Sequence, residues 1–479
     1  MRTNTLQRLS AALFRPVDIA FLVYFRIAFG AIMLWEVYRF FTHGWISRYY
    51  IEPLVHFTYY GFSWVKPWPG RGMYVHFFVL GVAAFCIIIG FCYRIAAAVF
   101  FVGFSYVFLL EQARYLNHFY LVCLIGFLLI FLPANRAVSV DALLRPKIRS
   151  DTVPAWTLWL LRAQIGVAYF FGGIAKLNSD WLFGGEPMRI WLSPFTKLPL
   201  FGPIVQNEWV VYSFVYGGLL LDLFIVPLLL WRKTRPFAFV AAIAFNLLNA
   251  IIFSIGIFPW FMLAASLVFF PPDLLRRFVR AIKSTGHASL DDAPETEELA
   301  PAVTEVDLPL TTAQRRTVFL LAAYLAIQIV MPLRHYAYPG NVSWTEEGHN
   351  FSWHMKLRTK GGNSIFSVVH PQSGQSWTID PAQYLPPWQL IKMSTKPDLI
   401  VQFAHHLAEE KRRQGYDNVE VRAKVMASLN GRRQQLMIDP DVDLTKVGVS
   451  LLPARWILPL TTSLETRGTA AEQDDEPEN

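Results

Sequence analysis

A single lysine, Lys176, ends a long apolar segment in the middle of the chain, within the stretch YFFGGIAKLNSDWL at residues 169–182. It follows Gly172 and Gly173, and the chain becomes polar directly after it. A lysine at the end of a membrane span often extends its ammonium into the lipid interface. An amine held in apolar surroundings instead favours its neutral form and can take a proton from a weakly acidic hydroxyl. The segment alone favours the interfacial anchor and leaves the base as the alternative.

Other polar side chains are predicted to lie at the same depth as Lys176. Asn117 and His118 begin one apolar segment, and Asn246 and Asn249 lie in the second half of another. Together they could form a pocket in which the amine takes the proton of a hydroquinone and the Asn117 amide orients the ring oxygens. The two glycines before the lysine would let a flat ring approach the backbone. Each side chain alone could equally be a helix-contact or interface residue.

Charged side chains within the apolar segments are further candidates, because a charge inside a membrane is costly and is usually paired or functional. Arg26, Arg162 and Asp222 fall near the middle of their segments. We expect a buried ion pair between Asp222 and one of the two arginines, with a structural role. Glu36 lies nearer one end of its segment and could line a site.

Composition places these residues in a membrane protein. Of 479 residues, 54% are hydrophobic and 16% are charged, against about 25% charged in a typical soluble domain. The basic residues form short clusters between apolar runs, which is the pattern of membrane topology and excludes nucleic-acid binding. The three cysteines lie in apolar segments without metal-ligand spacing, so no metal site is expected.

The apolar runs predict a polytopic α-helical membrane protein of about nine spans. Lys and Arg concentrate in every second connecting segment, beginning with the N-terminal one. The positive-inside bias therefore predicts a cytoplasmic N-terminus and a C-terminal part on the outer side, which is periplasmic or extracellular in a bacterium and lumenal in a eukaryote. We place the spans near residues 17–38, 73–92, 95–110, 116–132, 155–175, 209–231, 236–254, 257–271 and 317–332.

The chain changes texture after the last predicted span. Apolar and polar residues alternate, and GGN at 361–363 and NG at 430–431 are typical hairpin turns. A long helical pattern separates the two turns. We therefore predict an α+β extramembrane domain. The predicted organisation is a membrane domain over 1–332 with a disordered acidic inner linker at 284–310, an outer α+β domain over 333–460, and a disordered tail over 461–479.

Several of these stretches, in the same order, resemble the vitamin K-dependent gamma-carboxylase family. They read YLNHFYLVCLIGFLLIF, LLRAQIGVAYFFGGIAKLNSDWL, LLLDL, IIFSIGIF, SWTEEGHNFSWHMKLR and QQLMIDPDVDL, and the likeness covers residues 15–460. The resemblance implies nine-span enzymes that oxidise reduced vitamin K with O2 to its epoxide. The base formed removes the γ-proton of a glutamyl side chain, and the carbanion captures CO2. The animal enzymes continue into a further β-rich portion, so we expect a short homologue.

The resemblance also implies roles for individual residues. Lys176 corresponds to the base that initiates the reaction. Asn117 and His118 correspond to a pair that contacts the quinol, and Tyr169 to a tyrosine of the same pocket. Asn246 stands where we associate a histidine with the animal enzymes.

Glutamate binding in the family is linked with an outer segment that departs here from the animal pattern. Its two tryptophans persist as Trp344 and Trp353, but the Leu-Tyr pair between them reads Gly348-His349. Trp344, Trp353 and His349 are therefore candidates for contacting the acidic substrate. Quinol oxygenation is implied more strongly than carboxylation of a glutamyl side chain.

Three functions stay open. One is a glutamyl carboxylase that uses reduced vitamin K or a related naphthoquinol, O2 and CO2, and that meets membrane lipid and a glutamyl peptide. Another is a quinol epoxidase that uses the base on a different acid. The third is a non-catalytic quinone-binding or transport protein. We find no convincing internal repeat, which argues against a transporter.

Overall fold

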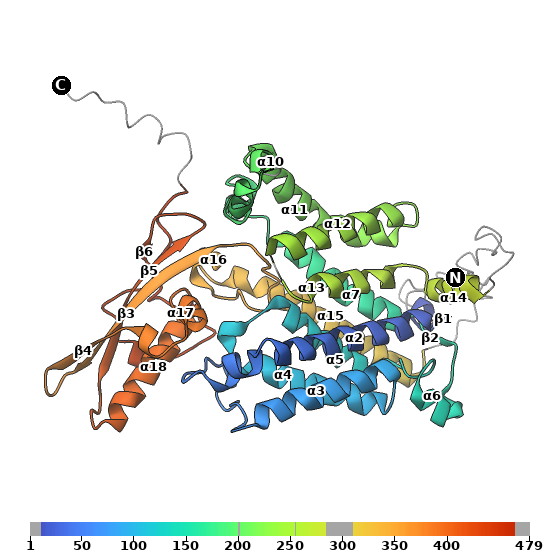
Figure 1. The fold of residues 1–479 in the computed structure, drawn as a ribbon, viewed down its shortest axis with the longest axis horizontal. Helices are drawn as coiled ribbons and strands as arrows, with labels where there is room; N and C mark the ends of the chain where they lie inside the picture. The colour runs from blue at the N-terminus through green and yellow to red at the C-terminus, as the bar shows by residue number, and fades with distance from the viewer. Residues whose placement is uncertain (1–10, 200–201, 254, 284–309, 465–479) are drawn as a thin grey trace.

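Nine apolar helices dominate the described part of the chain (Figure 1). The structure is a computed structural model that describes residues 11–199, 202–253, 255–283 and 310–464. Two of these helices are short, α5 (Asn117–Phe131) and α13 (Phe258–Ser266). The predicted polytopic membrane fold with an extramembrane domain is confirmed. The seven helices that are long and apolar enough to cross a membrane are α2 (Ala20–Thr42), α3 (Gly72–Ile89), α4 (Tyr93–Leu110), α7 (Trp156–Ile174), α11 (Glu208–Leu230), α12 (Arg235–Phe253) and α15 (Thr312–Leu333).

Local sequence signals set the ends of several helices. At the start of α15 the Thr311 hydroxyl accepts a hydrogen bond from the backbone N–H of Gln314, whose side chain accepts one from the N–H of Thr311. This capping box satisfies two backbone donors that the helix cannot pair internally. α3 ends at Gly90 with a φ of 65°, a left-handed conformation that glycine adopts without steric cost.

The membrane body is built from two halves that begin in the same way. β1 (Pro16–Asp18) leads into α2 and β2 (Thr152–Pro154) leads into α7, and the two strands pair antiparallel. An arginine follows eight residues after each strand, Arg26 in α2 and Arg162 in α7. The paired strands lie at the end of the body farthest from the C-terminal domain (Figure 1).

The two arginines make equivalent contacts. Arg26 donates to two carbonyl oxygens in the turn after α5, at 2.6 and 2.9 Å, and Arg162 donates to two at the end of the α13 segment, at 2.9 and 3.2 Å. Gly30, four residues after Arg26, lies against α3, and Gly166, four residues after Arg162, lies against α11. In the first half, α2 thus contacts α3 and the end of α5. In the second half, α7 contacts α11 and the end of α13 in the same way. This is a parallel repeat, so our expectation of no internal repeat is wrong and gives no argument against a transporter.

These contacts also correct the predicted ion pair. Asp222 bonds to Lys176 and not to an arginine. Arg162 lies ten residues before Gly172, where an added Cβ would lie 3.5 Å from Asp222 Oδ2. At a rise of 1.5 Å per residue this is about 15 Å along the helix, far beyond ion-pair distance.

The C-terminal domain is a four-stranded antiparallel sheet with helices on one face (Figure 1). Alternate residues of the two central strands are buried, and so is one face of the helix α18 (Pro397–Arg413). Together they form a separate core that includes Phe366, Phe403 and Val421. The strand order is β4-β3-β5-β6. The elements are β3 (Lys360–His370), β4 (Gln375–Ile379), β5 (Glu420–Leu429), β6 (Gln435–Leu436), α17 (Pro387–Met393) and α18 (Pro397–Arg413).

One predicted hairpin is confirmed and the other is wrong. The turn at Asn430 and Gly431 joins β5 to β6. The GGN sequence is not a turn, because Gly361 and Gly362 lie inside β3 and pair with β5. A Cβ on Gly362 would lie 2.5 Å from the carbonyl oxygen of Ser394. Glycine is needed there for close backbone approach and not for a reversal of the chain.

Two buried polar contacts fix the C-terminal domain on the membrane body. Arg432 donates to both carboxylate oxygens of Asp180, at 2.6 and 2.7 Å, and Asn430 donates to Asp180 at 2.8 Å. Gln389 donates to the Glu111 carboxylate at 2.8 Å. The first contact holds the segment that directly follows Lys176. The predicted acidic linker lies almost wholly outside the described residues, as does most of the predicted tail.

Candidate functional site

The Lys176 side chain forms a buried ion pair with Asp222 of α11. Its Nζ lies 2.5 Å from Asp222 Oδ2 and also donates to the Gly172 carbonyl oxygen at 3.1 Å. Only 7% of the lysine side chain and 5% of the aspartate side chain are exposed. The lysine is therefore not a surface anchor, because its amine is turned inward against a carboxylate.

The glycines before Lys176 make this pair possible by close helix packing. A Cβ on Gly173 would lie 2.7 Å from the Leu223 side chain, and one on Gly172 would lie 2.9 Å from the Met355 side chain. Small residues let membrane helices approach closely. We expected these glycines to admit a flat ring, and this is wrong, because both sites are filled by protein.

An apolar cavity of about 450 Å³ opens beside the ion pair. It lies between α7, α11 and α12, and Lys176, Tyr169 and Asn246 line it. Gly217 and Gly218 of α11 also line it, and a Cβ on Gly217 would meet no atom within 4 Å. Ligand pockets commonly span 300–1,000 Å³ and combine apolar walls with a few polar groups. The cavity has the size and lining of a site for an apolar ring system.

One polar group in this cavity has polar neighbours but no well-formed hydrogen bond within the described part of the chain. The Tyr169 hydroxyl is buried near Asn246 and Ser266 but makes no hydrogen bond of ordinary geometry with any described residue. A buried hydroxyl without a partner is costly, so such a group commonly serves a ligand. A ring that carries oxygens fits this requirement, because it would present an apolar face to the walls and an oxygen to the hydroxyl.

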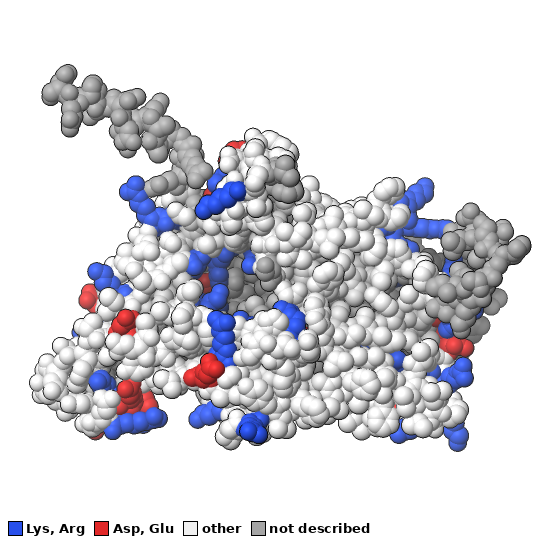
Figure 2. Space-filling view, in the orientation of Figure 1, with Lys and Arg blue, Asp and Glu red and all other residues white. Residues whose placement is uncertain are grey.

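A second cavity, of about 530 Å³, lies between the membrane body and the C-terminal domain. Asn117, His118 and Glu36 line it from the membrane side. Figure 2 shows Lys and Arg gathered around a hollow at this junction. We call it the cationic cavity. Its basic lining residues are Arg39, Arg114, Lys356, Arg358, Lys360, Lys392 and Lys396.

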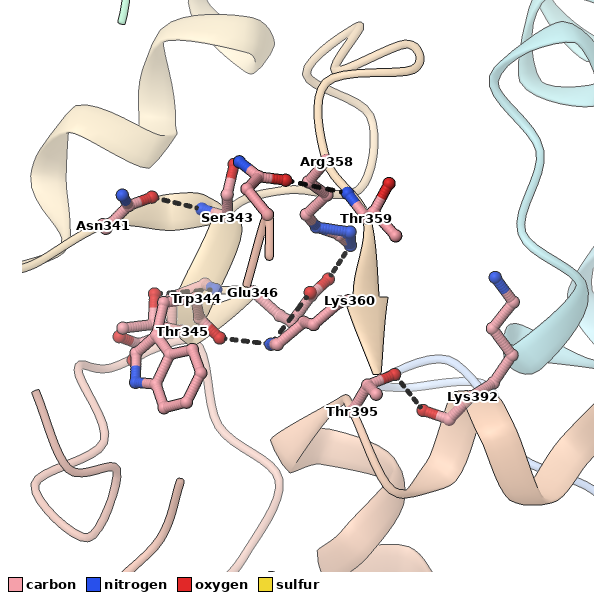
Figure 3. A network of polar contacts seen from close by, with 12 residues as sticks. Asn341, Ser343, Trp344, Thr345, Glu346, Arg358, Thr359, Lys360, Lys392 and Thr395 are labelled. Carbon is pink, nitrogen blue, oxygen red and sulfur yellow. Dashed lines mark hydrogen bonds and ion pairs between the residues drawn. The ribbon is translucent and has the colours of Figure 1, made fainter. Parts of the chain in front are cut away.

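The charges of this cavity are only partly compensated. Glu346 bonds to Arg358 and to Lys360, as Figure 3 shows. Burial raises the pKa of Glu346, but these two cations outweigh burial and hold it below its usual value. Burial lowers the pKa of Lys360 to about 7 and that of Lys396 to about 8. An anion in the cavity would relieve the repulsion among these groups.

Two buried histidines add to the cationic cavity. His349 and His354 line it, their ring centroids are 5.0 Å apart, and neither ring nitrogen of His354 has a hydrogen-bond partner among the described residues. Burial lowers the pKa of His354 to about 3 and that of His349 well below its usual value. Both rings are therefore neutral at physiological pH and can each offer one N–H donor.

The two cavities share a wall. Phe253, Ile255, Phe258, Met355 and Lys356 line both of them. The His118 ring, on the cationic side, lies 5.9 Å from the Phe258 ring. A group formed in the apolar cavity would therefore be close to a ligand in the cationic cavity.

The arrangement agrees with comparisons to known families. The HTTM domain model matches residues 14–274, more than half of the chain, and the model of the vitamin K-dependent gamma-carboxylase lumenal domain matches residues 313–463. The chain belongs to the vitamin K-dependent gamma-carboxylase family. No solved structure matches it.

The carboxylase-family residues predicted from the sequence are divided between the two cavities. Lys176, Tyr169 and Asn246 line the apolar cavity, while Asn117, His118 and His349 line the cationic cavity. The Asn117 amide donates to the His354 carbonyl oxygen at 3.1 Å and so ties α5 to the C-terminal domain. The predicted residues thus form two neighbouring sites and not one pocket.

The two candidate tryptophans line neither cavity. Trp344 and Trp353 are fully buried. Trp344 donates to the Leu458 carbonyl oxygen at 2.7 Å, and the Trp353 ring lies 5.1 Å from that of Tyr120. Both tryptophans pack at the two ends of the segment that carries His349, and the Trp344 ring lies 5.3 Å from the amine of Lys360, which lines the cationic cavity.

Sequence reasoning missed several residues of this site. Asp222 was assigned to an arginine, and His354, Lys356 and Arg358 were not singled out. Their signal is the stretch HMKLR, which places three basic or titratable side chains at the end of a family motif. Lys360, Lys392 and Lys396 gave no comparable signal, since surface lysines look the same in sequence.

Proposed function

We propose that this chain is a naphthoquinol-dependent carboxylase of acidic substrates, with the quinol in the apolar cavity and the acid in the cationic cavity. The observation that carries this proposal is the Lys176–Asp222 pair in an apolar cavity that shares a wall with a cavity lined by seven basic side chains. A base beside an apolar ring site and an anion site within reach of it are the two parts that such an enzyme needs.

The residues of the apolar cavity would bind and deprotonate the quinol. Once the pair has released its own proton to solvent, the neutral Lys176 amine would take the proton of a ring hydroxyl, and Asp222 would hold the amine in place and stabilise the charged form that results. Tyr169 and Asn246 would contact the ring oxygens. When bound, the reduced naphthoquinol supplies the driving force, since its oxidation by O2 yields the epoxide and water and provides a base stronger than any side chain.

The residues of the cationic cavity would hold the acid. Its ammonium and guanidinium groups would bind the carboxylate of a glutamyl side chain. The base would remove a proton from the carbon next to that carboxylate, and the electron pair left on the carbon would form a bond to CO2. The product carries a second carboxylate, which the remaining cations would stabilise.

A second candidate is the same chemistry on a different acid. It is favoured by the segment that departs from the animal enzymes, where Gly348 and His349 stand in place of a Leu-Tyr pair. His349 supplies a polar ring to the cationic cavity, and Gly348 has a φ of 71° and lies directly on His335. A Cβ on Gly348 would lie 2.7 Å from the His335 Cα, so the segment cannot carry a larger side chain there. We place both candidates on the outer side of the membrane, following the charge bias.

The test is to add a reduced short-chain vitamin K, a glutamyl peptide and labelled CO2 to the purified protein under air. Epoxide and labelled peptide should both form. Lys176→Ala should abolish epoxide formation, and Lys176→Arg should do so too, because a guanidinium stays protonated and cannot act as a base. Epoxide at the parent rate from either variant would remove Lys176 from the mechanism.

A further inference from the structure

We propose that Lys356 binds the carboxylate of the acidic substrate at the wall between the two cavities and stabilises the second negative charge that forms when the neighbouring C–H bond is broken. This inference rests on the proposed function and assigns a role in carboxylation to a residue that lines both cavities.

The position of Lys356 is the first observation. Five residues line both cavities, and Lys356 is the only one among them with a charged side chain. The other four are Phe253, Ile255, Phe258 and Met355, which are apolar. A carboxylate bound to this ammonium would be the part of the acid nearest to the apolar cavity.

The lack of a counter-ion is the second observation. Among the described residues no carboxylate lies within 4.0 Å of the Lys356 amine, which instead lies 5.1 Å from the Phe253 ring and 5.9 Å from the Trp191 ring. Lys176 is paired with Asp222 and Lys360 with Glu346. An ammonium over aromatic faces is stabilised but keeps its capacity to bind an anion.

The backbone around Lys356 is the third observation. Phe351, Trp353 and Lys356 have φ values of 64°, 57° and 48°, a left-handed conformation that side chains rarely adopt. Contacts with the membrane body hold this segment at both ends. The Phe351 N–H donates to the Tyr115 hydroxyl at 2.6 Å, and Met355 packs on Gly172. Strained backbone that is fixed from both sides is typical of functional sites.

The chemistry explains why a cation is needed at this wall. Removal of the proton leaves an electron pair on the carbon, and this charge spreads onto the oxygens of the adjacent carboxylate, which then carries two negative charges. The proton goes to the base supplied by quinol oxidation, and the electron pair forms the bond to CO2, so this step needs no further oxidant. A cation on those oxygens stabilises the doubly charged form more than the singly charged one and therefore accelerates the step.

The test compares Lys356→Met with Lys392→Met, because Lys392 lines the cationic cavity alone. Removing one donor that stabilises developing charge typically lowers kcat about 10²–10³-fold. We expect this loss of carboxylation kcat for Lys356→Met while epoxide continues to form, and partial recovery in Lys356→Arg. Lys392→Met should mainly raise KM for the peptide. Equal kcat in Lys356→Met and the parent would overturn the proposal.

A binding measurement separates this proposal from the proposed function. Malonate has the two carboxylates of the product and so presents two negative charges close together, as the doubly charged form also does, whereas acetate presents one, as the ground state does. By calorimetry without quinol, Lys356→Met should bind malonate about tenfold more weakly while acetate binding changes less, because the cation favours the dianion. Unchanged malonate affinity in a variant that melts like the parent overturns the role of Lys356. Absence of epoxide from the parent protein would instead refute the quinol chemistry.

Discussion

Replacing Asp222 by asparagine tests the central pair directly. The substitution keeps the size of the side chain and its ability to accept a hydrogen bond from Lys176, but it removes the negative charge that lies 2.5 Å from the amine. Both side chains are buried in the membrane body, so water cannot replace the lost partner. Removing one partner of a buried ion pair typically costs about 3–5 kcal/mol.

If Asp222 stabilises the charged amine formed when Lys176 takes a proton, the same energy is lost in the transition state of that step. At 1.36 kcal/mol for each tenfold change, it corresponds to a rate lowered about 10²–10⁴-fold. The assay is single-turnover epoxide formation from a reduced short-chain vitamin K, scaled to the folded fraction of each sample. Parent-like rates in Asp222→Asn would refute the reasoning, because the carboxylate would then be a structural partner only.

Asp180→Asn is the matched control. Asp180 is as buried as Asp222 and also loses an ion pair, to Arg432, but it does not line the apolar cavity. It should lower thermal stability while the rate per folded molecule stays near that of the parent. A similar loss of rate in both variants would mean that general loosening, and not the lost charge, explains the effect.

Three further predictions follow from the packing and the charges. Lys360 and Lys396 lose their positive charge as the pH rises through about 7 and 8, whereas the glutamyl carboxylate stays ionised. The affinity for a glutamyl peptide should therefore fall over this range and recover at lower pH, as measured by a titration at constant salt. Gly173→Ala should push α11 away from α7 and cost about 1–3 kcal/mol of stability, measured by thermal unfolding, because overpacking of a close contact is costly. A cysteine at Ser373 should react with an impermeant thiol reagent in intact cells and one at Lys147 should not; the reverse pattern would invert the predicted sidedness.

Sequence alone predicted those features that depend on neighbouring residues. The spans follow from apolar runs, the hairpin at Asn430 from turn chemistry, and the choice of Lys176 as candidate base from the family motif around it. The GGN stretch misled because the same glycines serve a turn or a close backbone approach. Which of these applies depends on Ser394, far along the chain.

The pairing within the site could not be read from the sequence for a related reason. Asp222 meets Lys176 only because Gly173 lets Leu223, and with it α11, approach α7. The shared wall depends likewise on the docking of the C-terminal domain, which several contacts hold together, among them Gln389 with Glu111 and Asn117 with the His354 carbonyl. Such contacts join segments separated by more than forty residues, and hydrophobic periodicity carries no information about them.

The repeated architecture shows that the charged pair is not required to build the frame. Phe40 follows Arg26 by fourteen residues, as Lys176 follows Arg162. In the first half this position holds an aromatic ring that stacks on Phe77 of α3, with centroids 4.7 Å apart. One molecule thus contains two versions of the same helix crossing, one closed by hydrocarbon and one by a lysine and an aspartate. The version with Phe40 shows that a helix pair of this body packs at this position without an ion pair, so the Lys176–Asp222 contact is a local feature of the second half.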